Sequence, residues 1–285
     1  MTRCVYVNGK FLQRRNAKVD IEDRGFNFGD AVYEVIFLNN GILVDEDEHL
    51  NRLEYSLSEL SIPLPKPRRI LSLLIREVVR LNRITNGFVY LQVTRGVSPR
   101  DHLIPNNITP GLVIMARSSN LIAKPSIRDG VSVITAPDLR WHRRDIKTTQ
   151  LIANCLAKSD AVKAGAGEAW MVDENGFITE GSSSNAWIVT SNREILTRPP
   201  SNEILNGITR RTIIALAKEE RLKLHERGFT TSEALKADEA FFTSATSLAT
   251  PVTSIDGHKI GSGKVGPVTK KLQALYIKFS GFQKE

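Results

Sequence analysis

Two Asn-Gly pairs, each between short apolar runs, constrain the fold of this chain most strongly. Asn8-Gly9 follows the apolar residues 4–7, and Asn40-Gly41 follows the apolar residues 32–38. Each pair precedes a second short apolar run, and a two-residue Asn-Gly loop matches the twist of two antiparallel strands. The pairs therefore predict two β-hairpins and exclude an all-helical N-terminal part.

Helical and strand patterns alternate after the second hairpin. Leu50, Leu53, Leu57 and Leu60 recur at helical spacing behind the acidic residues 45–48, which favour a helix N-terminus. The other elements expected in the first part are a helix with the apolar stripe Ile70, Leu73, Leu74, Val78 and Leu81, and strands at residues 88–94 and 112–116. The elements expected in the second part are a strand at residues 131–136, a helix after Lys147 with the apolar stripe Leu151, Ile152, Cys155, Leu156 and Val162, hairpins at residues 169–178 and 186–196, a helix at residues 208–221, a strand at residues 239–243 and a final helix after Gly266-Pro267.

The length of 285 residues is sufficient for about two domains. Residues 119–130 are polar and show no periodicity. We therefore expect an N-terminal domain at residues 1–118, a linker at residues 119–130 and a C-terminal domain at residues 131–285. Because both parts mix strands with helices, the patterns predict an α/β or α+β fold, with the ligand site in a cleft between the domains.

Composition narrows the class of protein. Hydrophobic residues make up 41% and charged residues 25%, which excludes a disordered, collagen-like or fibrous chain. No apolar run approaches the ~20 residues of a membrane span, and the first residues lack the apolar core of a secretory signal. We therefore expect a soluble cytoplasmic protein in which Cys4 and Cys155 are free thiols.

The net charge of +8 permits anionic partners. Basic residues are spread along the chain, and the densest patch, residues 140–144, is short. Neither a zinc-finger spacing nor an RNA-binding aromatic motif is present. A solvated basic surface is therefore favoured over nucleic-acid binding.

Four polar segments are candidates for chemistry. Residues 22–35 combine dense charge with two glycines, and Lys147 stands before an apolar helix, where a lysine opposes the helix dipole. Residues 179–185 place a carboxylate before small hydroxyl residues, and residues 206–210 place Thr209 at a helix start, which suits a phosphate. Taken singly, each is better explained as an ordinary loop, a surface lysine, a solvated turn or a helix cap.

Taken together and in this order, the four segments resemble those of the fold-type IV pyridoxal-phosphate (PLP) transaminases. The resemblance extends from Tyr6 to about Leu275 and is strongest to the D-amino-acid transaminases. It implies a two-domain α/β (α+β) enzyme of the D-amino-acid aminotransferase type, with PLP as cofactor between the domains. It also implies a homodimer in which the partner subunit helps to line the active site.

The resemblance assigns the cofactor site residue by residue. Lys147 matches the Schiff-base lysine, which also moves the substrate's α-proton, and Glu180 matches the acid that faces the pyridine nitrogen. Arg52 matches the family's arginine that binds the phosphate, and its planar fork suits a bidentate contact. The remaining phosphate contacts fall on Ile208, Thr209, Ser244 and Ala245. Ala245 stands where the family has a threonine, so one hydroxyl contact is lost.

The substrate's α-carboxylate is trapped in D-amino-acid transaminases by a tyrosine and an Arg-x-His pair, which match Tyr33, Arg100 and His102. Val35 and Phe37 match further positions of the substrate pocket. Phe37 departs from the lysine of the D-amino-acid enzymes and from the arginine of the branched-chain enzymes. We expect Phe37 to make the pocket more apolar and to admit bulkier side chains.

The function implied is ping-pong transamination between D-amino acids, such as D-alanine and D-glutamate, and 2-oxo acids, such as 2-oxoglutarate and pyruvate. Two alternatives share the fold: a branched-chain L-amino-acid aminotransferase and an aminodeoxychorismate lyase. A non-catalytic basic binding protein is a more distant alternative. The partners expected are therefore small molecules and a second copy of the chain, without nucleic acid, membrane or metal.

Overall fold

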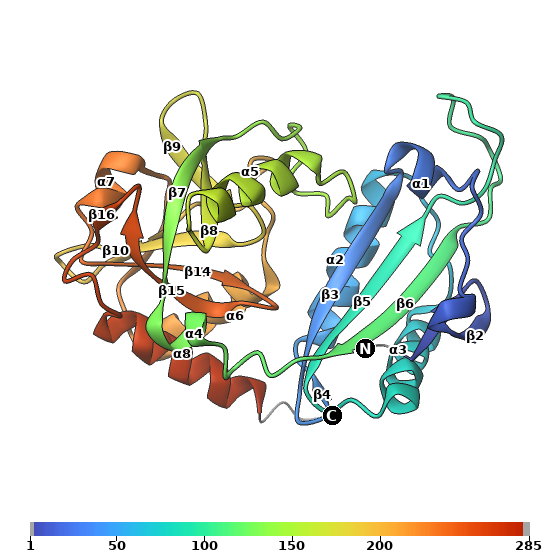
Figure 1. The fold of residues 1–285 in the computed structure, drawn as a ribbon, viewed down its shortest axis with the longest axis horizontal. Helices are drawn as coiled ribbons and strands as arrows, with labels where there is room; N and C mark the ends of the chain where they lie inside the picture. The colour runs from blue at the N-terminus through green and yellow to red at the C-terminus, as the bar shows by residue number, and fades with distance from the viewer. Residues whose placement is uncertain (1–2, 282–285) are drawn as a thin grey trace. The chain divides into compact units, whose positions relative to one another are not determined.

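The computed structural model describes residues 3–281, which divide into two compact units (Figure 1). Unit 1 contains residues 3–120 and 146–150, and unit 2 contains residues 121–145 and 151–281. Each unit has its own sheet, so the predicted mixture of strands and helices is confirmed in both. The division differs from the expected boundaries in two places. Residues 125–129 form a helix of unit 2 instead of a linker, and residues 146–150 cluster with unit 1.

Unit 1 is built on an antiparallel sheet of six strands in the order β2-β1-β6-β5-β3-β4. Its strands are β1 (Cys4–Val7), β2 (Lys10–Gln13), β3 (Ala31–Asn39), β4 (Ile42–Leu43), β5 (Gly87–Thr94) and β6 (Gly111–Ser118). Its helices are the 3-10 turn η1 (Arg14–Asn16), α1 (Arg24–Phe28), α2 (Glu46–Glu59) and α3 (Arg68–Asn82). Both predicted hairpins are confirmed. Asn8 and Asn40 have φ angles of 45° and 51°, the left-handed geometry that this type of turn requires.

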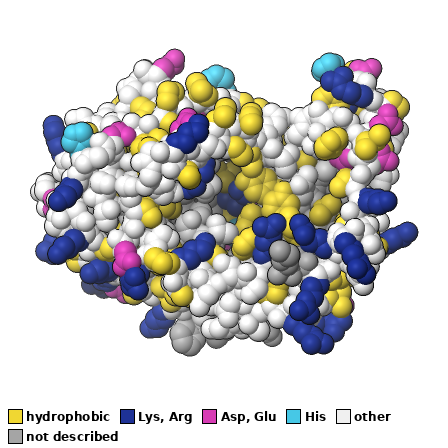
Figure 2. Space-filling model, viewed as in Figure 1, with side chains coloured by type: hydrophobic (Ala, Val, Ile, Leu, Met, Phe, Trp, Pro, Cys, Tyr) yellow, Lys and Arg dark blue, Asp and Glu magenta, His cyan; other side chains and the backbone are white. Residues whose placement is uncertain are grey.

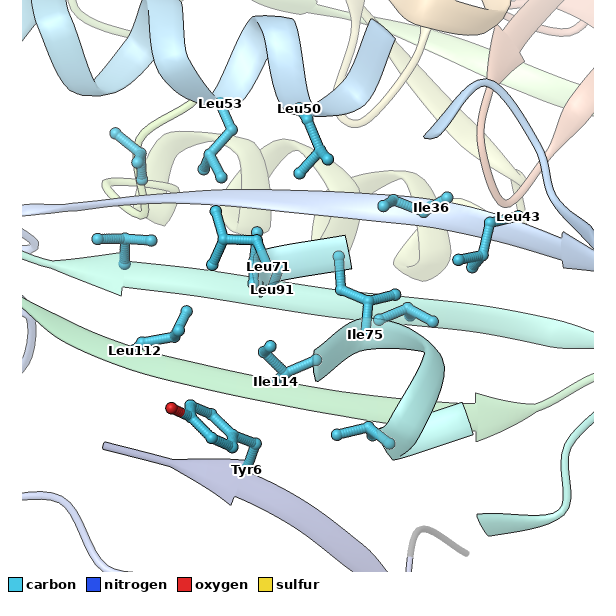
Figure 3. Close-up of a cluster of buried hydrophobic side chains, with 14 of the residues drawn as sticks. Tyr6, Ile36, Leu43, Leu50, Leu53, Leu71, Ile75, Leu91, Leu112 and Ile114 are labelled. Carbon is cyan, nitrogen blue, oxygen red and sulfur yellow. The ribbon is translucent and has the colours of Figure 1, made fainter. Parts of the chain in front are cut away.

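Helices α2 and α3 cover one face of this sheet, and the core of unit 1 lies between the helices and the sheet (Figure 3). The predicted stripe of α2 is confirmed, since Leu50, Leu53 and Leu57 are buried. The stripe predicted for α3 is confirmed in part, since Val78 is buried and Leu74 packs against the core. The side chains that pack on the sheet are Leu71, Ile75 and Val78, whereas Ile70 and Leu73 are 39% and 54% exposed. The buried positions follow one another at spacings of four and three, so they form a second possible helical face that the sequence did not distinguish.

Residues 146–150 lie along the edge of β3. The Tyr33 amide donates to the Lys147 carbonyl oxygen at 3.0 Å, and Thr148 forms an antiparallel bridge with Val32. Because side chains alternate along extended backbone, Ile146 joins the core while Lys147 points to the opposite face. Helix α5 begins only at Ile152, so the expectation that Lys147 stands at a helix start is wrong.

Unit 2 contains a mixed sheet in the order β12-β11-β10-β14-β15-β7-β8-β9-β13, with β16 paired to β15. Its strands are β7 (Val131–Pro137), β8 (Glu168–Val172), β9 (Phe177–Gly181), β10 (Asn185–Val189), β11 (Ile195–Thr197), β12 (Leu224–Glu226), β13 (Phe229–Thr230), β14 (Glu239–Ser244), β15 (Leu248–Ile255) and β16 (His258–Lys259). Its helices are α4 (Pro125–Asp129), α5 (Ile152–Lys163), α6 (Ile208–Glu219), α7 (Thr231–Leu235) and α8 (Pro267–Ser280). The two predicted hairpins, the helix near residues 208–221 and the final helix are confirmed.

Helix α5 packs through its small side chains. Ala157 and Ala161 contact a buried cluster that includes Met171, whereas Ile152, Leu156 and Val162 are 74%, 56% and 63% exposed. The expectation that the apolar stripe of this helix faces the core is therefore wrong. Two alanines allow a helix to approach a sheet closely, so the larger side chains turn outward.

The surface agrees with the dispersed charge of the sequence. On the face shown in Figure 2, Lys and Arg side chains are scattered among acidic, apolar and uncharged groups. Within residues 3–281, no helix is both long enough and apolar enough to cross a membrane. The two cysteines are free thiols, as predicted, with Cys4 half-buried and Cys155 exposed.

Candidate functional site

The Lys147 side chain lies over an aromatic ring of unit 1. Its ammonium is 4.2 Å from the centre of the Tyr33 ring, and its backbone amide donates to the Ser56 hydroxyl at 3.2 Å. A ring face attracts a cation more weakly than a carboxylate does. Within residues 3–281, no carboxylate forms an ion pair with Lys147. The Lys147 side chain is therefore held over the Tyr33 ring rather than by a carboxylate.

The predicted substrate residues of β3 share the face on which the Lys147 ammonium lies. Tyr33, Val35 and Phe37 alternate with Val32, Ile36 and Leu38, which point into the core beneath α2 and α3. The Tyr33 ring stacks on Tyr90 of β5 at 5.6 Å. Burial, together with the neighbouring Tyr33, raises the pKa of Tyr90 to about 12, so this hydroxyl stays neutral. The face is thus aromatic and uncharged around the lysine.

Arg52 forms a bidentate ion pair with a buried carboxylate. Its Nε and Nη2 donate to the Glu34 oxygens at 2.8 and 2.9 Å, and His49 Nδ1 lies 2.7 Å from Glu34 Oε2. Burial alone raises the pKa of a carboxyl, but Arg52 and His49 hold the pKa of Glu34 well below its usual range. Glu34 is therefore ionised and fixes the guanidinium of Arg52. The sequence offered no signal for this pair beyond a glutamate inside an apolar strand.

Arg100 and His102 lie in the segment between β5 and β6. The Arg100 guanidinium is 5.3 Å from the centre of the Phe28 ring, and the His102 ring is 5.6 Å from it. In the described part of the chain, neither side chain has a hydrogen bond or ring contact with Tyr33. Unit 1 therefore brings Arg100 and His102 together at Phe28, while Tyr33 stands with Lys147.

Glu180 is a buried carboxylate on β9 of unit 2. It accepts hydrogen bonds from Arg140 and, at 2.9 Å, from the Asn185 side-chain amide; the Leu205 backbone amide lies 3.2 Å from its oxygens. Burial raises the pKa of Glu180 above its usual range, and Arg140 opposes this effect. Arg140 also forms a bidentate pair with Asp138, at 2.9 and 2.7 Å. The site thus holds a carboxylate whose ionisation is supported by one guanidinium.

The basic patch at residues 140–144 is not a solvated surface throughout. The side chains of Arg140 and Arg144 are only 7% and 8% exposed, and both face Asp138. The sequence interpretation missed Arg140 as a functional residue. Its one signal was Asp138 two positions earlier, whose carboxylate also accepts a hydrogen bond from the Arg140 backbone amide at 3.2 Å.

The serines that follow Glu180 are held by another carboxylate. Glu168, which is buried, accepts hydrogen bonds from the hydroxyls of Ser182 and Ser184, and the Ser183 hydroxyl lies 3.4 Å from it. The sequence marked this segment as a candidate for chemistry. In the structure, the serine hydroxyls fix the turn that connects β9 to β10.

The N-terminus of α6 lies next to the Glu180 network. Gly207 is the residue before the helix, and a Cβ at this position would collide with Asn185 Oδ1. The same asparagine donates to Glu180, so it connects the carboxylate to the helix start. The first amides of an α-helix lack partners within the helix and attract anions. Ile208 and Thr209 begin this helix and are both buried.

Arg210 is the last residue of the predicted segment 206–210, and the contacts of its guanidinium lie outside that segment. Its guanidinium donates to the Arg198 carbonyl oxygen and to Glu226, at 2.8 and 2.7 Å, and it lies over the Trp187 ring. These contacts of Arg210 stabilise unit 2.

Ser244 and Ala245 form the turn after β14. The Ser247 amide donates to the Ser244 hydroxyl at 3.1 Å, and Lys124 Nζ lies 3.2 Å from the Thr246 carbonyl oxygen. Burial lowers the pKa of Lys124 below its usual range. This lysine belongs to the segment that was expected to be a linker, and its position at the turn was not predicted.

Comparisons with known proteins identify the family of the chain. Residues 31–255 match the model of the amino-transferase class IV family. The chain is 45% identical over 271 residues to the D-alanine aminotransferase of Bacillus licheniformis, covering 94% of each chain. It is 40% identical over 279 residues to the D-alanine aminotransferase of Staphylococcus haemolyticus, covering 96% of this chain and 97% of that one.

Among solved structures, the branched-chain amino acid aminotransferase of Escherichia coli has a TM-score of 0.92 and 26% identity, covering 100% of this chain and 97% of the other. A branched-chain amino acid aminotransferase of T.th., complexed with N-(5'-phosphopyridoxyl)-L-glutamate, has a TM-score of 0.89 and 26% identity, covering 99% and 96%. The expected fold-type IV architecture is thus confirmed.

Proposed function

Because the chain belongs to the class IV aminotransferase family, we propose that it transfers the amino group of a D-amino acid to a 2-oxo acid. D-Alanine and D-glutamate are the expected amino acids, and pyruvate and 2-oxoglutarate the expected oxo acids. The observation that carries this proposal is the Lys147 ammonium, which lies over Tyr33 without a carboxylate partner in the described residues. The ammonium lies on the same face of β3 as the side chains of Val35 and Phe37.

The donor set fits PLP as the cofactor. An available amine, a buried carboxylate and an open helix N-terminus are the three groups that a phosphorylated pyridine aldehyde requires. Lys147, Glu180 and Thr209 supply them, and Arg52, Ile208, Ser244 and Ala245 would complete the phosphate contacts. When bound, PLP supplies an electron sink for the charge left at the substrate's α-carbon.

The roles of the chain's own residues follow from their chemistry. Lys147 Nζ would hold the cofactor through its aldehyde carbon and, once the substrate's amino group has displaced it, would move the α-proton. Glu180 holds a proton on the pyridine nitrogen, for which it must be ionised. Arg100 donates to the substrate's α-carboxylate, and the Tyr33 hydroxyl and His102 add hydrogen bonds.

We propose a homodimer as the active form. The exposed apolar side chains Ile152, Leu156 and Val162 give α5 a surface that a second copy would cover. Within the described residues Tyr33 has no hydrogen bond or ring contact with Arg100 or His102, which supports a partner that helps to line the site. Sedimentation tests this proposal, which a fully active monomer would contradict.

A half-reaction on the PLP-loaded protein tests which enantiomer of an amino acid it accepts as substrate. D-Alanine is added to one sample and L-leucine to another, and the visible absorbance of PLP bound to Lys147 is followed. We expect loss of absorbance with D-alanine only. A Lys147→Ala variant, which has no such absorbance at the start, is the control. A protein without this absorbance in excess PLP would show that Lys147 is misassigned.

A branched-chain L-amino-acid aminotransferase is the second candidate. The solved structures of such enzymes match the whole fold, which favours this alternative. Phe37 argues against it, since the branched-chain pattern has an arginine there. Loss of absorbance with L-leucine alone would establish the alternative.

A further inference from the structure

We propose that the ring of Phe28 positions both Arg100 and His102 and so sets the affinity for the substrate's carboxylate. This inference rests on the proposed function, in which those two side chains bind that carboxylate. Phe28 is a positioning residue, because it acts through the two donors and does not itself contact the substrate. It lies in the segment at residues 22–35 that the sequence marked as a candidate for chemistry, and the proposed function gave that segment no role outside β3.

One ring carries both donors. The Arg100 guanidinium lies over the Phe28 ring at 5.3 Å, an attractive cation–π geometry. The His102 ring meets the same ring at 5.6 Å and a tilt of 55°, within the range of aromatic pairs. Because a single side chain contacts both groups, it fixes their positions relative to each other.

The donors need such a support. Arg100 and His102 are both exposed, and they lie in the long segment between β5 and β6, which runs past α1 in Figure 1. An exposed arginine loses considerable rotamer entropy when it binds a ligand in one geometry. A contact that restricts the side chain beforehand reduces this loss on binding. Phe28 is half-buried and provides that contact.

Phe28 is itself held firmly by the helix that carries it. The Asp23 carboxylate accepts a hydrogen bond from the Gly25 amide at 2.8 Å and caps α1. The helix ends at Gly29, whose φ of 64° is the left-handed conformation that glycine adopts readily. The last residue of α1 is therefore fixed from both ends of the helix.

Arg24 connects the same helix to the backbone of the donor segment. Its guanidinium donates to the carbonyl oxygens of Asp101 and Leu103, at 2.7 and 3.3 Å, on either side of His102 in the sequence. It also pairs with Asp30 at 2.8 Å and lies 4.7 Å from the centre of the Phe28 ring. The backbone of the donor segment and its two side chains are thus both fixed to α1.

The test compares Phe28→Leu with Phe28→Tyr in the PLP-loaded protein. Leucine keeps an apolar side chain but removes the ring face, whereas tyrosine keeps the ring. Phe26→Leu is the matched control, because Phe26 is on the same helix and is 76% exposed. Arg100→Gln is made in parallel to test the carboxylate contact itself. Circular dichroism and the thermal midpoint verify that each variant is folded.

Two readouts are measured. The first is the KM for D-alanine and for pyruvate, together with kcat. The second does not depend on activity: it is the proton NMR shift of the His102 ring, assigned among the five histidines with a His102→Asn variant. A nearby aromatic ring displaces that signal.

We expect Phe28→Leu to raise both KM values about tenfold with a much smaller change in kcat, since two ring contacts are lost. The displaced His102 signal should also move toward its ordinary position. Phe28→Tyr should restore both, and Phe26→Leu should change neither. An unchanged KM and an unchanged His102 signal in Phe28→Leu would overturn the inference, provided that Arg100→Gln raises the KM. If Arg100→Gln itself leaves the KM unchanged, the carboxylate trap of the proposed function is wrong and Phe28 loses its role with it.

Discussion

Arg140 donates hydrogen bonds to both Asp138 and Glu180, two carboxylates that are almost wholly buried. Arg140 is therefore shared between two buried carboxylates of unit 2, of which Asp138 is also paired with Arg144 at 3.5 Å. Burial raises the pKa of Glu180, and Arg140 is the first of the groups that oppose this effect. The ionisation that the proposed mechanism requires of Glu180 thus depends on a residue outside the expected site.

Replacement of Arg140 by methionine should destabilise the protein by about 3 kcal/mol near neutral pH, because it leaves buried carboxylates without their partner. The pKa of Glu180 should then rise further. A carboxyl whose folded pKa is raised contributes stability at low pH that is lost as the pH rises through that pKa. The loss of unfolding free energy in Arg140→Met relative to wild type, measured by urea unfolding, should therefore be smaller at pH 5 than at pH 8. Arg128→Met, in an exposed pair with Asp129, is the control, and an equal deficit at both pH values would contradict the interpretation.

Glu34 gives the opposite dependence on pH. Arg52 and His49 hold its pKa well below the usual range, so its contribution to stability is present above the ordinary pKa of a glutamate and is lost as the pH falls. Glu34→Gln should therefore lower the free energy of unfolding at pH 7 by about 3 kcal/mol and should flatten its decline on acidification. Glu77→Gln, in an exposed pair with Arg80, should leave the acid profile as it is. If Glu34→Gln retains the wild-type acid profile, the ion pair does not contribute as described.

Ala245→Thr should slow the loss of PLP. The substitution restores a hydroxyl at the turn after β14, and one hydrogen bond contributes about 1 kcal/mol, which corresponds to roughly fivefold tighter retention. Dialysis of the loaded protein, followed by its visible absorbance, measures the rate of loss. Ala164→Thr, at an exposed position after α5, is the matched control. Equal rates in wild type and Ala245→Thr would show that this turn does not contact the phosphate.

Local patterns sufficed to predict the elements whose cause is local. The Asn-Gly hairpins and the Leu50, Leu53 and Leu57 stripe depend on turn geometry and helical period, and both are confirmed. The predicted face was right only in part for α3 and wrong for α5, because each helix offers two apolar faces and only the packing partner selects one. The choice for α5 depends on Ala157 and Ala161, whose small size carries little weight in a hydrophobic pattern.

The candidate site shows the same limit. Lys147, Tyr33 and Glu180 were named from the sequence because their motifs are continuous. Arg140 and Phe28 were missed, since each acts through a residue that the sequence alone does not bring to it. Glu180 stands 40 positions from Arg140, and several strands and helices separate Phe28 from Arg100 along the chain. Contacts over such separations arise only from the folded chain.

Phe37→Lys should change the choice of substrate. Phe37 is buried on β3, on the face that carries Tyr33 and Val35, and it pairs with Phe88 of β5. A lysine in its place would add a charge to an apolar wall and should disfavour large apolar side chains. We expect kcat/KM for D-leucine to fall about tenfold relative to that for D-alanine, the effect of losing roughly 1.4 kcal/mol of apolar contact.

The measurement compares the two substrates within one variant, so a general loss of folded protein cancels. Phe37→Leu is the control, because it keeps the wall apolar and should retain most of the preference for the larger substrate. Since burying an amine also costs stability, the thermal midpoint of each variant is recorded beside the ratio. An unchanged ratio in Phe37→Lys would show that Phe37 does not line the pocket. The phenylalanine that replaces the family's lysine or arginine would then serve packing of the sheet instead of substrate choice.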